Sequence, residues 1–176
     1  VMDTGLIHIY CGDGKGKTTA AVGLAIRCVG RGGRVVFAQF LKTRETGELA
    51  VLQQLDAVTV MRGEGLSKFT FQMTPDELED TKRRQKALFH DIVEHCLREK
   101  PDMLVLDEAL PACRLGLLPE DELLSFLRTR PDTLEVVLTG RDPSERLLAL
   151  ADYVSEICKR RHPYDRGIPA RAGIEE

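Results

Sequence analysis

The sequence predicts an α/β fold of three layers, with a mostly parallel central sheet between two layers of helices. Short runs of β-branched and apolar residues alternate with segments of helical pattern, which favours parallel strands joined by right-handed connections. The run Val35–Ala38 is apolar throughout, as expected of a strand covered on both faces. A glycine-rich segment, residues 12–16, separates the first strand run from the first helical segment. Because 176 residues suffice for one well-buried domain, we expect a single domain over residues 1–176.

Five elements are expected in the first part of the chain. Leu6–Tyr10 is a β-branched run that stops at a Cys-Gly turn, so it predicts the first strand. The helix that follows contains the small residues Ala20, Ala21 and Gly23, and three glycines mark its end. The strands are expected at residues 6–10, 34–40 and 58–61, and the helices at residues 17–29 and 49–55.

A long helix is expected from Thr74 to about Lys100, after an irregular segment at residues 62–74. Thr74 can cap this helix, Pro75 suits its first turn, and the acids Asp76 and Glu77 face the positive end of the helix dipole. Further strands are expected at residues 103–107, at 134–139 and, as an edge strand, at 153–157, with helices at 119–127 and 142–150. Residues 159–176 are rich in Gly, Pro and Arg and predict an irregular tail.

The composition favours a soluble protein of a reducing compartment. A formal net charge of -3 gives no general electrostatic reason to expect nucleic acid or an anionic membrane as partner. We also find no signal-peptide pattern and no apolar run near the roughly 20 residues that span a bilayer. The cysteines are scattered without a C-x-x-C pair, so we expect buried free thiols and a cytoplasmic protein. They are Cys11, Cys28, Cys96, Cys113 and Cys158.

The strongest functional signal is a phosphate-binding loop between the first strand and the first helix. Backbone N–H groups of its glycines can converge on phosphate oxygens at a helix start, which makes the fold a P-loop NTPase fold. Lys17 can neutralise phosphate charge, and the Thr18 hydroxyl can bind Mg²⁺. Cys11 stands where the usual pattern has its first glycine, so the loop is one residue tighter. Its residues are Gly12, Asp13, Gly14, Lys15, Gly16, Lys17, Thr18 and Thr19.

An acidic pair, Asp107 and Glu108, ends the apolar strand at residues 103–107. A carboxylate at the carboxyl end of a parallel strand beside a phosphate loop can hold Mg²⁺ directly or through water, which we favour over a helix cap. Arg141 lies at the end of another strand and is expected to contact phosphate or substrate. Arg27, on the first helix, could either reach a nucleotide or extend into solvent.

Two aromatic residues, Phe69 and Phe71, stand in the irregular segment on either side of Thr70. Composition alone favours side chains that fasten this loop to the core, whereas alternately spaced aromatics could also flank a large flat ligand. His8 alternates with apolar neighbours in a strand, so we expect it to be structural. His90 and His95 have a poor spacing for a metal and are assigned no role.

From the phosphate loop to the tail, the chain resembles the ATP:corrinoid adenosyltransferases. The shortened loop is the first point of similarity, and nearly the whole chain follows in order. The matching segments are Gly12–Ala21, Gln39–Lys42, Gly63–Gly65, Phe69–Phe71, Leu106–Glu108, Leu138–Arg141, Ala151–Asp152, His162–Asp165, Gly167–Ile168 and Gly173–Glu175.

This resemblance implies a RecA-like fold, a homodimer, and transfer of the 5′-deoxyadenosyl group of ATP to the cobalt(I) of a corrinoid, with release of triphosphate. It implies Mg²⁺ or Mn²⁺ as cofactor and an electron donor such as a reduced flavoprotein. By position, Lys17 and Thr18 would hold triphosphate and metal, Glu108 would lie at the metal and nucleotide, and Arg27 would contact the nucleotide. Phe69 and Phe71 match an aromatic pair that helps remove the lower axial ligand of cobalt(II).

Two other functions remain open on the residues alone. The first is a P-loop ATPase or kinase, although we find no obvious residue to activate water or an acceptor hydroxyl. The second is a RecA-like module that binds nucleic acid in response to nucleotide, against which the acidic balance weighs. The sequence also leaves open whether the acceptor is a complete cobalamin or a biosynthetic precursor.

Overall fold

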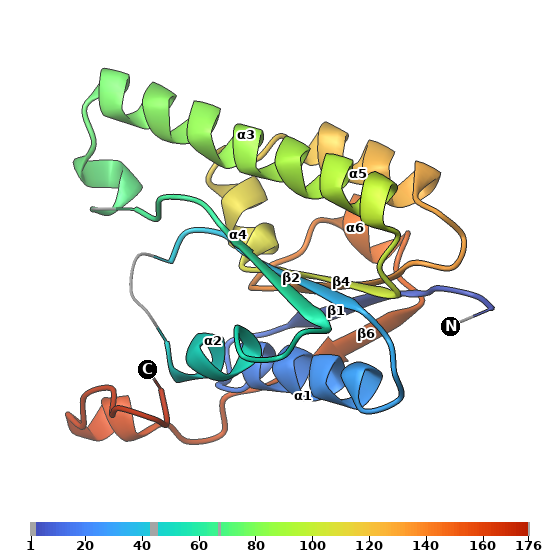
Figure 1. Ribbon diagram of the computed structural model, residues 1–176. Coiled ribbons are helices and arrows are strands. Elements are labelled where there is room, and N and C mark those ends of the chain that lie inside the picture. Colours follow the sequence, from blue (N-terminus) through green and yellow to red (C-terminus); the bar gives the residue numbers. More distant parts are fainter. Residues whose placement is uncertain (1–2, 43–45, 67, 176) are drawn as a thin grey trace.

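The computed structural model describes residues 3–42, 46–66 and 68–175, and these form a parallel sheet covered by helices (Figure 1). Among the described residues the sheet has six strands in the order β3-β2-β4-β5-β1-β6, and every neighbouring pair is parallel. The predicted α/β fold is therefore confirmed, with a sheet that is entirely parallel. The strands are β1 (Ile7–Cys11), β2 (Val35–Gln39), β3 (Val58–Arg62), β4 (Met103–Asp107), β5 (Glu135–Thr139) and β6 (Tyr153–Glu156).

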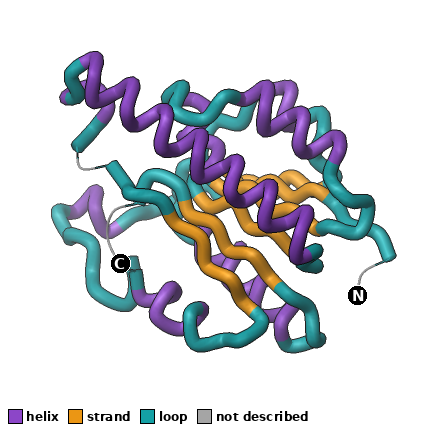
Figure 2. Tube along the Cα trace, turned by 45° about the horizontal axis from the view of Figure 1, so that its top comes forward, coloured by secondary structure: helices purple, strands orange, loops and turns teal. Residues whose placement is uncertain are grey.

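Helices cover both faces of the sheet, as Figures 1 and 2 show from two directions. On one face, Ala21 and Ala25 of α1 (Lys17–Val29) share an apolar cluster with Leu49 and Leu52 of α2 (Gly47–Leu52). On the other face a larger cluster joins the remaining helices to the sheet. These are α3 (Pro75–Glu99), α4 (Ala109–Arg114), α5 (Glu120–Thr129) and α6 (Glu145–Leu148).

The boundaries of α3 follow the local signals in the sequence. Thr74 and Glu77 form a reciprocal capping box at its start, and Pro75 occupies the first turn. Lys100 adopts a left-handed conformation with φ 49° and closes the helix. The helix predicted from Thr74 to Lys100 is thereby confirmed over Pro75–Glu99.

The structure adds one helix to the expected elements and shortens another. Helix α4 was not expected, but Pro111 lies in its first turn, where a missing N–H costs no helical hydrogen bond. Helix α6 is shorter than the expected 142–150 because Asp142 has a φ of 50° and Ser144 caps a helix of four residues. Single 3-10 turns, η1 (Thr70–Gln72) and η2 (Pro163–Arg166), lie in the segments expected to be irregular.

The parallel sheet brings the chemically interesting residues to one edge. In its register Gln39 pairs with Asp107, and Tyr10 pairs with Thr139. The carboxyl ends of β1, β2, β4 and β5 therefore lie together. Residues that follow these strands can meet although they are far apart in the sequence.

Two expectations from composition can be compared with the structure. Among the described residues no helix is both long enough and apolar enough to cross a bilayer. All five cysteines are free, as expected, but only Cys11 and Cys96 are buried, and Cys158 is exposed. The expectation that each cysteine packs as a buried hydrophobe is therefore wrong for Cys158.

Candidate functional site: a phosphate loop beside a buried acid

The glycine-rich loop connects β1 to α1 and is shaped by its close approach to the chain after β6. The Gly14 N–H donates to the Ile157 carbonyl at 2.7 Å, and the Ile157 N–H donates to the Cys11 carbonyl at 2.8 Å. Gly16 immediately precedes the helix with a φ of 121°, a conformation that side chains disfavour. The loop is thus held against a second segment of backbone and opens into the N-terminus of α1.

Gly14 leaves no room for a side chain. A Cβ at this position would lie 2.7 Å from the Ile157 carbonyl oxygen and 2.9 Å from the Cys158 carbonyl carbon. Because both atoms belong to backbone, we expect Gly14→Ala to lower stability by about 1–3 kcal/mol and to weaken nucleotide binding. Thermal unfolding and titration with a fluorescent ATP analogue would measure the two effects.

Gly23→Ala is the matched control, because Gly23 lies within α1 and a Cβ there meets nothing within 4 Å. Helix propensity predicts a gain of about 0.5–1 kcal/mol for this variant, with nucleotide affinity unchanged. If Gly14→Ala bound the analogue as tightly as the wild type, close packing of the loop would not matter for its geometry.

Lys17 is folded back over the loop that precedes it. Its ammonium group donates to the carbonyl oxygens of Gly12 and Gly14, each at 2.8 Å. Burial lowers the pKa of this ammonium, and the positive charge of Arg141 lowers it further. A cation held among backbone groups and only partly hydrated is well placed to attract phosphate oxygens.

Asp107 is the buried centre of the site, with an exposed fraction of 0%. The Thr18 and Thr139 hydroxyls donate to its Oδ1 at 2.8 and 2.7 Å. The Gln39 amide and the Lys42 ammonium donate to its Oδ2 at 3.0 and 2.8 Å. The carboxylate thus joins the first helical turn of the phosphate loop to the ends of β2 and β5.

Glu108 follows in a left-handed conformation, with a φ of 61°. Its N–H donates to the Thr139 hydroxyl at 3.0 Å, which fixes the turn between β4 and α4. Burial, reinforced by the charge of Asp107, raises the pKa of the Glu108 carboxyl. Such a strained conformation at a strand end is typical of functional positions, and here it places a second carboxylate beside the loop.

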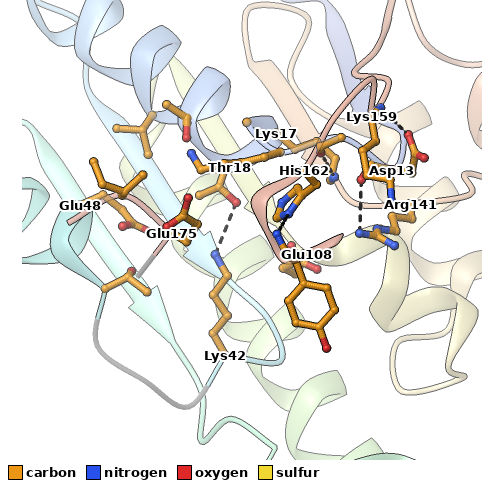
Figure 3. A pocket seen from close by; sticks show the side chains of 18 of the residues that line it. Asp13, Lys17, Thr18, Lys42, Glu48, Glu108, Arg141, Lys159, His162 and Glu175 are labelled. Carbon is orange, nitrogen blue, oxygen red and sulfur yellow. Dashed lines mark hydrogen bonds between the residues drawn. The ribbon is translucent and has the colours of Figure 1, made fainter. Parts of the chain in front are cut away.

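The loop and the acid pair border a cavity of about 910 Å³ that the C-terminal tail also lines (Figure 3). The Lys159 N–H donates to Asp13 Oδ1 at 2.8 Å, and this hydrogen bond lowers the pKa of Asp13. Lys159 Nζ forms an ion pair with Asp165 at 3.1 Å, which joins the start of the tail to η2. The tail residues at the cavity are Lys159, His162, Tyr164, Asp165, Gly173, Ile174 and Glu175.

The structure brings most of the predicted site residues together. Loop residues 13–19, Glu108 and Arg141 line the cavity, Gly12 binds Lys17 through its carbonyl, and Asp107 binds Thr18. Arg141 also donates to the Asp13 carbonyl at 3.4 Å. Thr18, Asp107 and Glu108, the three predicted metal ligands, thus lie at a single place in the fold.

Apart from Gly12 and Asp107, which bind lining residues, three predicted residues are not among the described residues that line this cavity. Arg27 is exposed in the last turn of α1, the end away from the loop, and its contact with a nucleotide stays a prediction. Phe69 and Phe71 are 68% and 81% exposed and stack on each other, with ring centroids 5.4 Å apart. The alternative in which they fasten the loop to the core is therefore wrong.

Sequence reasoning missed Gln39, Lys42, Thr139 and the tail as parts of the site. Gln39, Lys42 and Thr139 lie at or just beyond the carboxyl ends of strands adjacent to β4. A position at the carboxyl end of a strand can indicate a site residue, but only when the order of the strands in the sheet is known. His8, expected to be structural, stacks on Tyr153 with centroids 4.5 Å apart and pairs with Glu135, away from the cavity.

The chain is similar to known proteins over nearly its whole length. Residues 3–175 match the protein family described as ATP:corrinoid adenosyltransferase BtuR/CobO/CobP. The chain is 34% identical to the corrinoid adenosyltransferase of Escherichia coli (strain K12), over 98% of this chain and 86% of that protein. It is 36% identical to corrinoid adenosyltransferase CobA of Salmonella typhimurium (strain LT2), with the same coverage.

A solved structure of much lower sequence identity has a similar fold. The KaiC-like protein PH0186 of Pyrococcus horikoshii OT3 superposes with a TM-score of 0.52, over 92% of this chain and 75% of that one. At 14% identity this similarity shows the fold alone.

Proposed function

The chain belongs to the ATP:corrinoid adenosyltransferase family and is an enzyme that adenosylates corrinoids with ATP, and from this premise we propose how its own residues carry out the transfer. The observation that carries the proposal is that the phosphate loop, Glu108 and Arg141 line one cavity, with buried Asp107 bonded to Thr18 beside it. In the proposed reaction the phosphate loop binds the leaving group. Cobalt(I) attacks C5′ of ATP with its electron pair, the bond from C5′ to oxygen breaks, and triphosphate leaves.

Stabilisation of the departing triphosphate is the main task of the side chains. Cobalt(I) is itself the nucleophile, so the reaction needs no side-chain general base. We assign charge stabilisation to Lys17 and Arg141 and to the backbone N–H groups at the start of α1. The remaining requirements are to align cobalt with C5′ and to exclude water.

The residues present fit a magnesium ion bound together with a nucleotide. The described residues contain no group of three or more His, Cys, Asp or Glu side chains that could hold a metal alone. Mg²⁺, however, usually takes one or two carboxylates and completes its shell with substrate phosphates and water. Gln39 is 2% exposed, and its Oε1 has no partner among the described residues, so it is available to accept from a metal-bound water. We assign Mg²⁺, or Mn²⁺, to Thr18, Asp107 and Glu108, where it would neutralise phosphate charge.

Phe69 and Phe71 are proposed to face the corrinoid and to favour removal of its lower axial ligand, which makes cobalt(II) easier to reduce. Their stacked, solvent-exposed rings supply the apolar surface that this role needs. We expect Phe69→Ala to slow the reaction from cobalt(II) about tenfold or more, while the reaction from prereduced cobalt(I) changes by less than about threefold. Both rates can be followed in the corrin absorption spectrum.

Leu97→Ala is the control for this prediction, because Leu97 is 54% exposed near the opposite end of α3. It should leave both rates at the wild-type value. An equal loss from cobalt(II) and cobalt(I) in Phe69→Ala would rule out a role in ligand removal.

One assay tests the proposed reaction as a whole. The protein is incubated anaerobically with ATP, Mg²⁺ and chemically reduced cobalamin, and the corrin spectrum is recorded. We expect a light-sensitive adenosylated product and one triphosphate for each product formed. Orthophosphate released without a corrinoid would instead indicate the ATPase or kinase, and ATP-dependent binding of an oligonucleotide would indicate the nucleic-acid module.

The remaining parts of the proposal concern the assembly, the electron donor and one further nucleotide contact. We propose that residues 1–176 act as a single domain within a homodimer in the cytoplasm, with electrons supplied by a donor such as a reduced flavoprotein. We further propose that Arg27 contacts the nucleotide. Size-exclusion chromatography with light scattering tests the homodimer directly.

A further inference from the structure

The position of Lys42 in the site calls for an explanation. Its ammonium lies 2.8 Å from Asp107 Oδ2 and 3.4 Å from Thr18 Oγ1, so it contacts two of the proposed metal ligands at once. Figure 3 shows this side chain reaching toward Thr18 from the segment after β2. Lys42 also lines the cavity and has a side chain 27% exposed, so it has a path toward solvent.

Lys42 supplies the positive charge in the hydrogen-bond shell of Asp107. The other donors that the structure shows to this carboxylate, from Thr18, Gln39 and Thr139, are neutral. A carboxylate with no exposure to solvent is costly to bury without a compensating cation. In the structure the Lys42 ammonium provides this compensation.

Lys42 and a divalent cation cannot both lie at these oxygens. Asp107 Oδ1 is already occupied by two hydroxyl donors, and Oδ2 is shared by the Gln39 amide and Lys42. A metal that binds between Thr18 and Asp107 would need the place of the ammonium, and the two positive charges would repel each other at such short range. Binding of the metal therefore requires Lys42 to move.

We propose that Lys42 is a stand-in cation, which neutralises Asp107 until a metal–nucleotide complex displaces it, so that the metal binds only together with ATP. The displaced ammonium stays at the cavity wall, where the phosphate chain is its available partner. Lys42 is a positioning residue in this arrangement, because it acts through the metal ligands. This inference rests on the proposed assignment of the metal to Thr18 and Asp107.

The test is Mn²⁺ binding to the nucleotide-free protein, measured by the decrease of the free Mn²⁺ signal in electron paramagnetic resonance. The wild type should bind Mn²⁺ weakly, and Lys42→Met should bind it about tenfold or more tightly, because the competing ammonium is gone. Lys159→Met is the matched control: it removes a lysine that also lines the cavity but pairs with Asp165. It should bind Mn²⁺ like the wild type.

Lys42→Gln provides a second variant in case Lys42→Met folds poorly, because its amide can still donate to Asp107 without a charge. It should also bind Mn²⁺ more tightly than the wild type, and added Mn²⁺ should raise its Tm in the absence of nucleotide. Equal Mn²⁺ affinity in the wild type and in both Lys42 variants would overturn the proposal. An equal increase in Lys159→Met would also overturn it, since the effect would then be one of total charge.

Mn²⁺ binding to the wild type in the presence of ATP distinguishes this inference from the assignment of the metal to Thr18 and Asp107. Tight Mn²⁺ binding with ATP, together with no gain in the Lys42 variants, rejects the stand-in cation alone. If Thr18→Ala binds Mn²⁺ with ATP as tightly as the wild type does, the metal assignment itself is wrong.

Discussion

Replacing Lys17 with alanine is expected to lower the rate of adenosylation by roughly 100- to 1,000-fold, even with cobalt(I) supplied and ATP saturating. The ammonium is partly buried over the loop and is held by the carbonyls of Gly12 and Gly14, so its position is set before the substrate binds. Negative charge develops on the leaving triphosphate as the bond from C5′ breaks, and a pre-positioned cation lowers the energy of that state. The corrin spectrum reports the rate.

Lys15→Ala is the control for this experiment, since it removes a lysine from the same loop but one whose side chain is exposed. We expect it to slow the reaction by less than about tenfold, because solvent screens an exposed charge. Thermal unfolding without nucleotide would establish that both variants fold. Equal rates for the two variants would mean that total charge, rather than the place of Lys17, assists the departure of triphosphate.

Local sequence patterns were enough to predict the sheet. The strands β2, β4 and β5 are buried at every residue, and their uninterrupted apolar runs reflect cover on both faces. Helix α4 is not predicted because it has only six residues and contains Pro111. It is too short to show a helical period of apolar residues, and proline is a poor helix former. The pair Asp142 and Pro143 is typical of a helix start, so the sequence predicts a longer α6, whereas Ser144 is the residue that caps it.

The candidate site could be predicted only where its residues are neighbours in the sequence. The phosphate loop and the pair Asp107 and Glu108 can each be recognised as functional from a few consecutive residues. Lys42 and Thr139 belong to the site because β2 and β5 both flank β4, which is a property of the strand order. The wall formed by the tail likewise depends on the contact of Gly14 with Ile157, which no local pattern encodes.

Phe69 and Phe71 show a third limit of prediction from sequence. Composition favoured packing of Phe69 and Phe71 on the core, because large apolar side chains are usually buried. The structure leaves both rings exposed, at 68% and 81%. Side chains that depart from the rules of folding are candidates for a binding role, and for these two residues that role stays a prediction.

Asp107→Leu is expected to cost about 3–5 kcal/mol of stability in metal-free buffer. The substitution leaves the Lys42 ammonium without its anion and the Gln39 amide without its acceptor, both beside a position with no solvent exposure. Urea denaturation would measure the loss, provided that the slope of the transition stays unchanged.

The double variant Asp107→Leu with Lys42→Met should recover part of this loss, because it removes both members of the ion pair. We expect it to be more stable than the sum of the single variants predicts, with a coupling energy of about 2 kcal/mol. Each single variant leaves one charge uncompensated, and that penalty is absent when both charges are removed. Additive losses would mean that Lys42 does not compensate Asp107 in the folded protein. That result would also remove the basis for proposing that Lys42 occupies the metal position before the metal–nucleotide complex binds.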